Sequence, residues 1–258
     1  MKKTYQMVER ALVDGLLKGD PQPGCPLQSE RDLATRFAVS RTTVREALLK
    51  LQNSGWISVE QRHATIVNDF WSRGNLELLS SISRNTEPFP PDVASHLLEL
   101  RLQLAPDYAR RAVENGATQL TECLNRVNKI RNSLTEMVKF DWELHLTMAV
   151  LSGNKIYPLI MNSFSTLYLR FKGCVFAKEE HRAQARSYYR DLLQAASTGN
   201  ADHAEDVTRA AMKMRLEEFR RQSGQLAPGK CMKQKFIRRQ FETRETIPRD
   251  IGIIPQKA

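Results

Sequence analysis

The sequence predicts a mainly α-helical fold in two parts: three helices and a β-hairpin come first, and an all-α helical bundle follows. Apolar residues recur at helical spacing through most of the chain, which is the first of three observations behind this prediction. The others are two short β-prone runs near residues 56–67 and the Gly- and Pro-rich breaks between periodic segments. The 258 residues suffice for two modest hydrophobic cores.

The composition is that of an ordinary globular protein, with 41% hydrophobic and 26% charged residues. No run of uncharged apolar residues approaches the roughly 18 that a membrane-spanning helix needs, and the first ten residues lack the apolar core of a signal peptide. Cys25, Cys123, Cys174 and Cys231 are scattered, without a spacing typical of metal ligands. We therefore expect a cytoplasmic protein with reduced thiols and no membrane partner.

The formal net charge of +10 indicates a polyanionic partner such as nucleic acid. Half of this excess lies in residues 223–258, which contain eight basic and three acidic residues and little periodicity. We expect that segment to be a basic, disordered tail. The placement of the remaining charges matters more than the total.

The first part contains the pattern of a helix-turn-helix. A first helix is expected at Thr4–Lys18. A short second helix, capped by Ser29, ends before the tight turn Ala38-Val39, and Ser40 caps a third helix that ends near Asn53. A hairpin joins Trp56–Val59 to Ala64–Val67.

The third helix has one apolar face and one polar face. Val44, Ala47, Leu48 and Leu51 form the apolar stripe, and the opposite face begins with Arg41, Thr42 and Arg45. An arginine can donate two hydrogen bonds to a guanine in the major groove, and the helix N-terminus at Ser40 suits a phosphate. A plain solvated arginine face on a small helical bundle remains the alternative reading of this spacing.

The second part is expected to contain helices only, after a linker at residues 69–74. This divides the chain into a helix-turn-helix domain at 1–68, a helical domain at 75–222, and the tail at 223–258. The expected helices are Leu76–Ser83, Val93–Glu114, Thr118–Asn132, Leu134–Ser152, Tyr157–Lys172, His181–Thr198 and Ala201–Gln222.

The first part resembles the GntR family of regulators. The resemblance lies in Pro26-Leu-Gln-Ser-Glu-Arg-Asp-Leu-Ala, in Val39-Ser-Arg-Thr-Thr-Val-Arg-Glu-Ala-Leu-Leu-Lys-Leu and in Gly55-Trp-Ile. It implies a winged helix-turn-helix in which Arg31, Arg41, Thr42 and Arg45 contact double-stranded DNA, beside the phosphate contact expected at Ser40. The wing departs from the family pattern, because Gln61-Arg62-His63 replaces the usual glycine at its tip. His63 is either a further DNA contact or an exposed loop residue.

Blocks in the second part resemble the fatty-acid-responsive FadR branch of that family: Val67-Asn-Asp-Phe-Trp, Leu100-Arg-Leu, Ser152-Gly-Asn-Lys-Ile-Tyr and Leu167-Tyr-Leu-Arg. This resemblance implies that the domain at 75–222 is an effector-binding and dimerisation domain, a bundle that binds long-chain acyl-CoA. Where the branch has small residues against the ligand, this chain has Met212 and Arg215, which could reduce or redirect the cavity. Arg101 and Arg170 could equally form interhelical salt bridges. The candidate ligand contacts are Arg101, Tyr168, Arg170, Tyr189, Met212, Arg215 and Phe219.

Asp141 and His145 stand one helical turn apart, as in a metal-binding sister branch of the family. The position of that branch's third ligand matches Tyr189, and two ligands make a weak site. We therefore expect no metal and an interhelical hydrogen bond from His145. A metal-dependent hydrolase is disfavoured because no nucleophile elbow, P-loop or dinucleotide fingerprint is present. No cofactor is expected, and the chain is not expected to be an enzyme.

The function expected from these observations is that of a homodimeric transcription regulator, either a repressor or an activator. It would bind a palindromic operator and leave it on binding long-chain acyl-CoA or, alternatively, another small organic acid. A sequence-neutral nucleic-acid binder that uses the basic tail is the competing interpretation. That interpretation leaves the ordered helix after Ser40 unexplained.

Overall fold

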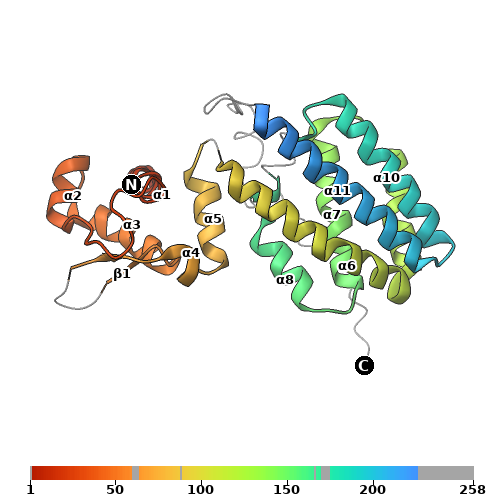
Figure 1. Ribbon diagram of the computed structural model, residues 1–258, viewed down its shortest axis with the longest axis horizontal. Helices are drawn as coiled ribbons and strands as arrows, with labels where there is room; N and C mark the ends of the chain where they lie inside the picture. The colour runs from red at the N-terminus through yellow and green to blue at the C-terminus, as the bar shows by residue number, and fades with distance from the viewer. Residues whose placement is uncertain (1, 60–63, 88, 166, 170–174, 226–258) are drawn as a thin grey trace.

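The computed structural model describes residues 2–59, 64–87, 89–165, 167–169 and 175–225. It contains a first group of helices with a small hairpin, joined to a larger bundle (Figure 1). The predicted fold class is confirmed. The first group comprises α1 Lys2–Leu17, α2 Glu30–Phe37, α3 Arg41–Asn53, β1 Ile57–Ser58, β2 Ile66–Val67, α4 Phe70–Arg73 and α5 Leu76–Asn85. The second comprises α6 Pro91–Asn125, the 3₁₀ helix η1 Arg126–Lys129, α7 Leu134–Leu151, α8 Ile156–Ser163, α10 Glu179–Ser197 and α11 Ala201–Gln225.

The helix-turn-helix forms because its ends are capped as the sequence predicts. The Ser29 hydroxyl accepts a hydrogen bond from Asp32 N at the start of α2, and the Ser40 hydroxyl accepts one from Thr43 N at the start of α3. Between the two helices, Ala38 adopts a left-handed conformation with φ 52°. This conformation turns the chain sharply, so α3 leaves α2 at once.

The wing is short. β1 and β2 pair antiparallel, with Ile57 opposite Val67, and Pro26 forms an isolated bridge to Ile66. The tip of this hairpin, including His63, lies outside the described residues. The predicted contact of His63 with DNA therefore stays a prediction.

Residues 69–74, expected as a linker, contain the helical turn α4. Phe70 is buried, and its ring centroid lies 4.7 Å from that of Trp56. The following helix, α5, is held to the first group by two buried hydrogen bonds, from Trp56 Nε1 to Ser81 Oγ and from Asn85 Nδ2 to Glu9 Oε1. The domain boundaries at residues 68, 74 and 222 stay predictions, but α5 packs on the DNA-binding side.

In place of the two helices expected at Val93–Glu114 and Thr118–Asn132, the structure has the single element α6, followed by η1. The helical conformation is interrupted only at Gly116, with φ −159° and ψ 43°. A Cβ on Gly116 would lie 2.8 Å from Leu151 Cδ2, so the missing side chain lets α7 approach the bend. The sequence break is therefore a kink rather than a loop.

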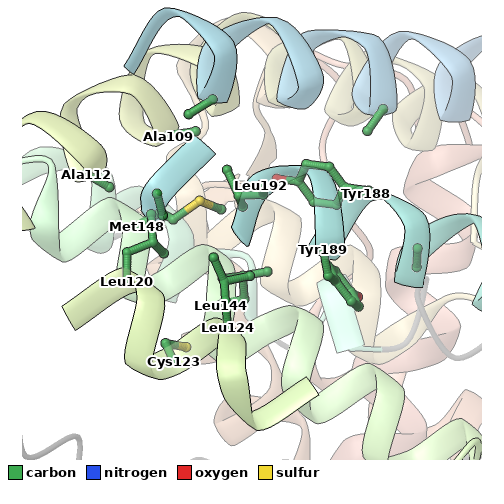
Figure 2. Close-up of a cluster of buried hydrophobic side chains, with 14 of the residues drawn as sticks. Ala109, Ala112, Leu120, Cys123, Leu124, Leu144, Met148, Tyr188, Tyr189 and Leu192 are labelled. Atoms are coloured by element: carbon green, nitrogen blue, oxygen red, sulfur yellow. The ribbon is translucent and has the colours of Figure 1, made fainter. Parts of the chain in front are cut away.

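The core of the bundle lies between α6, α7, α10 and α11. Figure 2 shows part of it, with Leu120 and Leu124 of α6, Leu144 and Met148 of α7, and Leu192 of α10 pointing toward one another. No described helix is long and apolar enough to cross a membrane. Beyond α11, residues 226–258 lie outside the described part of the chain.

Candidate functional sites

The recognition surface lies at the N-terminal end of α3. Its apolar stripe is buried as predicted, through Val44, Ala47, Leu48 and Leu51. Arg41, Thr42 and Arg45 are exposed on the other face. Because the buried stripe fixes α3 on the core, these three side chains point outward at the N-terminal end of α3. This is the end that a recognition helix places in the major groove of DNA.

Two further predicted contacts flank this surface. Arg31 is exposed in the first turn of α2, where its guanidinium can reach a phosphate. Ser40 is exposed as well, and its hydroxyl oxygen lies 2.9 Å from Thr43 Oγ1 in addition to capping α3. A phosphate at Ser40 would therefore meet a hydroxyl and free N–H groups of the first helical turn.

An acidic residue that the sequence analysis did not single out lies beside these arginines. Glu30 accepts two hydrogen bonds from Arg45, from Nε at 3.1 Å and from Nη2 at 2.8 Å. The Arg45 hydrogen bond lowers the pKa of Glu30, so this carboxylate stays charged at neutral pH. The sequence shows Glu30 within the family motif Ser29-Glu30-Arg31, but it does not show that Glu30 pairs with Arg45 of α3.

The bundle contains a buried polar cluster around Asp141 of α7, whose carboxylate is fully buried. Tyr189 of α10 donates to Asp141 Oδ1 at 2.7 Å, and Tyr168 donates to Asp141 Oδ2 through a short hydrogen bond. Arg101 Nη2 and Arg215 Nη1 each lie 3.8 Å from this carboxylate. Four of the candidate ligand residues thus meet at one acid.

His145 also belongs to this cluster. The Tyr108 hydroxyl is hydrogen-bonded to His145 Nδ1 at 2.8 Å, and His145 Nε2 lies 3.9 Å from Asp141 Oδ1. Tyr108 is on α6 and His145 on α7, which is the interhelical hydrogen bond that the sequence analysis expected. Across the described residues, no group of three or more His, Cys, Asp or Glu side chains could hold a metal ion.

An apolar pocket of about 90 Å³ lies beside this cluster, between α6, α7, α8 and the side chains of Phe164, Leu167 and Tyr168. Arg101, Tyr108 and Tyr168 belong to both its wall and the polar cluster. The rest of the wall is largely aliphatic and aromatic, formed by Ala94, Leu97, Leu98, Leu100, Leu104, Trp142, Tyr157, Ile160, Met161, Phe164 and Leu167. Such a wall suits an aliphatic group.

Four candidate ligand residues that the structure describes do not line this pocket: Tyr189, Met212, Arg215 and Phe219. Met212 is buried in the bundle core, and Arg215 lies 3.8 Å from Asp141 Oδ1 and 5.9 Å from the centroid of the Tyr188 ring. Phe219 packs against the first hydrophobic cluster instead. Arg170 lies outside the described residues. Sequence reasoning missed the pocket residues Trp142, Tyr157 and Phe164, because nothing in local periodicity separates a pocket wall from a core.

Comparisons with known proteins agree with both parts of the chain. Residues 4–67 match the family described as "Bacterial regulatory proteins, gntR family", and residues 68–225 match "FadR C-terminal domain". The chain is similar to the "Fatty acid metabolism regulator protein" of Shewanella pealeana, at 32% identity over 77% of this chain and 83% of that protein. The namesake from Shewanella amazonensis is 34% identical over 76% of this chain and 81% of its own length.

Among solved structures, one of Lar, described as controlling expression of the Listeria monocytogenes agr system, has a TM-score of 0.55 at 16% identity. It covers 86% of this chain and 97% of that one. At that identity the likeness concerns the fold alone.

Proposed function

The chain belongs to the GntR family of bacterial regulatory proteins, with a FadR C-terminal domain. From this premise we propose that it is a homodimer that binds a palindromic operator and controls fatty acid metabolism. An aliphatic acyl ligand enters the bundle and releases the DNA. The names of the relatives support the fatty-acid role. Long-chain acyl-CoA is the expected form of this ligand.

The apolar pocket is the observation that carries the ligand part of the proposal. It brings an aliphatic and aromatic wall together with one largely buried arginine, Arg101, whose side chain is 13% exposed. An amphipathic acid needs this combination, because its chain leaves water while its charge stays paired. No set of catalytic groups accompanies the pocket walls described here.

The pocket is also connected to the DNA-binding side of the molecule. Ala94 and Leu167 line the pocket and at the same time belong to the hydrophobic cluster that contains the cores of α1, α3 and α5. Ser80 of α5 donates a hydrogen bond to the carbonyl oxygen of Ser163, the last residue of α8. A ligand that moves α8 or Leu167 would therefore act on α5 and, through it, on the recognition helix.

The pocket volume limits what fits without movement. A cavity of roughly 150 Å³ holds one benzene molecule, so about 90 Å³ is too small for a long acyl chain. None of the eight residues of α8 is fully buried, and only Tyr157 and Met161 among them pack against the described core of the bundle, so α8 is the wall that an entering acyl chain would displace. A small organic acid, which needs less movement, is the second candidate ligand.

Calorimetry with oleoyl-CoA and with small dicarboxylates, combined with DNA release measured by fluorescence anisotropy, tests the ligand. A hundredfold loss of operator affinity requires about 2.7 kcal/mol of coupling. Met212→Gly with Arg215→Ser removes two large side chains of α11 that lie in the bundle beside the pocket and not in its wall. This double variant should strengthen oleoyl-CoA binding if the acyl chain extends beyond the pocket into the bundle core. If neither ligand class binds either protein, the fatty-acid assignment fails and a DNA-binding regulator remains.

The homodimer is tested separately. A single recognition helix reads few base pairs, so two copies related by a two-fold axis provide the usual length of site. Sedimentation at micromolar concentration should show two chains, both free and on a palindromic duplex. A monomer under both conditions contradicts this part of the proposal.

A further inference from the structure

The positive charge of the chain is most concentrated in residues 230–239, which we call the basic segment. It contains five basic residues and no acidic one, the highest net charge of any ten-residue stretch in the sequence. Residues 240–258 hold three basic and three acidic residues and add nothing to it. The five basic residues are Lys230, Lys233, Lys235, Arg238 and Arg239.

This charge exceeds that of the whole helix-turn-helix domain. Residues 1–68 contain ten basic and seven acidic residues, a net charge of +3, against +5 in the basic segment. The total of +10 leaves +5 for the rest of the chain, so the segment does not neutralise an acidic body. Since the attraction of a protein to DNA grows with the number of phosphates that it neutralises, a polyanion is the partner that this segment suits.

The chain leaves the bundle on the side of the helix-turn-helix. Phe219, near the end of α11, packs against the hydrophobic cluster that includes Val44 and Leu51 of α3. Arg220 Nη2 donates a hydrogen bond to Glu99 Oε1 of α6 at 2.7 Å. Figure 1 shows this end of α11 at the end of the bundle that faces the first group of helices. One hydrophobic cluster thus joins the last turns of α11 to the buried stripe of the recognition helix.

The distance along the chain is sufficient to reach bound DNA. Lys230 follows the last residue of α11, Gln225, by five residues, which span at most about 18 Å. Arg239 follows it by fourteen residues, which span at most about 50 Å. A small domain is about 30 Å across, so the basic segment can pass beside the helix-turn-helix to a duplex that α3 holds.

We propose that the basic segment binds the phosphate backbone of duplex DNA beside the site that α3 reads. This adds a second DNA contact to the proposed function and rests on its DNA-binding part. The segment lies beyond the residues that match the FadR C-terminal domain. Contacts to phosphates carry no sequence information, so the segment strengthens binding to operator and random DNA equally. Selectivity stays with Arg41, Thr42 and Arg45.

The test uses the full chain with the five basic residues of the segment replaced by glutamine. Fluorescence anisotropy follows binding to a library-selected operator, with and without one helical turn of flanking DNA on each side, and to a random duplex. Wild type should bind the flanked operator at least tenfold more tightly than the trimmed one. The glutamine variant should bind both alike. Its ratio of operator to random binding, measured on duplexes of equal length, should match that of wild type.

Salt titration counts the contacts. Each phosphate contact contributes about 0.9 to the slope of log K against log salt concentration, so the slope of the glutamine variant should be less steep by about 2 to 4.5 per chain. Exchanging lysine for arginine and arginine for lysine at the same five positions keeps the charge and should keep the wild-type slope. Thermal unfolding should be the same for all these proteins, because no described core residue is changed.

The matched control removes five exposed basic residues from the bundle, which lowers the net charge by the same amount. Its slope should stay within about one unit of wild type, because these scattered charges make no set of phosphate contacts. The five residues, each replaced by glutamine, are Lys129, Lys139, Lys155, Arg190 and Lys213.

Three results would overturn the assignment. The first is a wild-type slope in the glutamine variant, whether or not the wild-type chain binds phosphatidylglycerol vesicles through the segment. The second is equal binding of wild type to flanked and trimmed operator. The third is a lower ratio of operator to random binding in the glutamine variant. The proposed function fails by a different result, in which the library yields no operator; the slope on random DNA then still tests the basic segment.

Discussion

Arg45 of α3 and Glu30, the first residue of α2, form a two-contact ion pair between the two helices. Arg45 Nη2 lies 2.8 Å from Glu30 Oε2, and Arg45 Nε lies 3.1 Å from Glu30 Oε1. This is a two-contact fork of the kind a guanidinium also offers to a guanine. In the DNA-free protein, Glu30 therefore occupies one donor edge of Arg45. It holds the arginine in one position and places a negative charge close to the surface that would meet DNA.

Glu30→Gln should raise affinity for random DNA and reduce the ratio of operator to random binding. The substitution removes a negative charge that repels phosphates, and it weakens the contact that orders Arg45. Fluorescence anisotropy with a library-selected operator and a random duplex, at several salt concentrations, measures both quantities. Asp14→Asn, which removes an exposed charge from α1, should leave the ratio unchanged. An unchanged ratio for Glu30→Gln would show that Glu30 does not position Arg45.

Arg41→Ala and Arg45→Ala should weaken operator binding and leave the fold intact, because both side chains are exposed at the start of α3. Each lost bidentate guanine contact costs roughly 1–3 kcal/mol. Gel-shift titration measures this loss, and thermal unfolding checks the fold. Lys18→Ala, directly after α1, removes the same charge away from the recognition helix and serves as the control. Affinities within twofold of wild type for both arginine variants would refute the assignment.

Asp141→Asn should destabilise the protein by about 3–5 kcal/mol, because removing one partner of a buried ion pair leaves the other charge uncompensated. Arg101 and Arg215 would both lose the carboxylate that now lies 3.8 Å from each. Urea unfolding at unchanged m-value measures the difference. Glu114→Gln, which breaks the exposed pair with Arg110, should change stability by about 0.5 kcal/mol or less. Equal effects of the two variants would mean that the cluster carries no buried charge.

Alkaline pH should destabilise the bundle through Tyr188. Burial raises its pKa from 10.0 to about 12, so the folded protein retains a phenolic proton that the unfolded chain loses. The stabilisation is therefore complete below pH 10 and is lost as pH rises through about 12. Urea unfolding between these pH values, followed beside tyrosinate absorbance, tests the trend. Tyr188→Phe should make the pH dependence less steep without abolishing it, because burial also raises the pKa values of Tyr108, Tyr168 and Tyr189. An identical slope in this variant would assign the effect to the other groups.

The sequence by itself determined the helix-turn-helix and its buried stripe, because the signals are local. The hydroxyls of Ser29 and Ser40 cap the helices that follow them, and the spacing of Val44, Ala47, Leu48 and Leu51 places one face inward whatever the rest of the chain does. The family motifs in this segment are equally local, and so the residues expected at the DNA surface could be named in advance.

Tertiary structure alone decided where a ligand can lie. Arg101, Asp141 and Tyr168 come from distant parts of the chain, and they meet only because α6 and α7 pack together with the segment after α8. Helical periodicity says which face of each helix is buried, but not which buried residues stand opposite one another. For the same reason, Met212 and Arg215 could be recognised as large residues on α11, yet only packing showed that Arg215 lies beside Asp141 and outside the pocket wall.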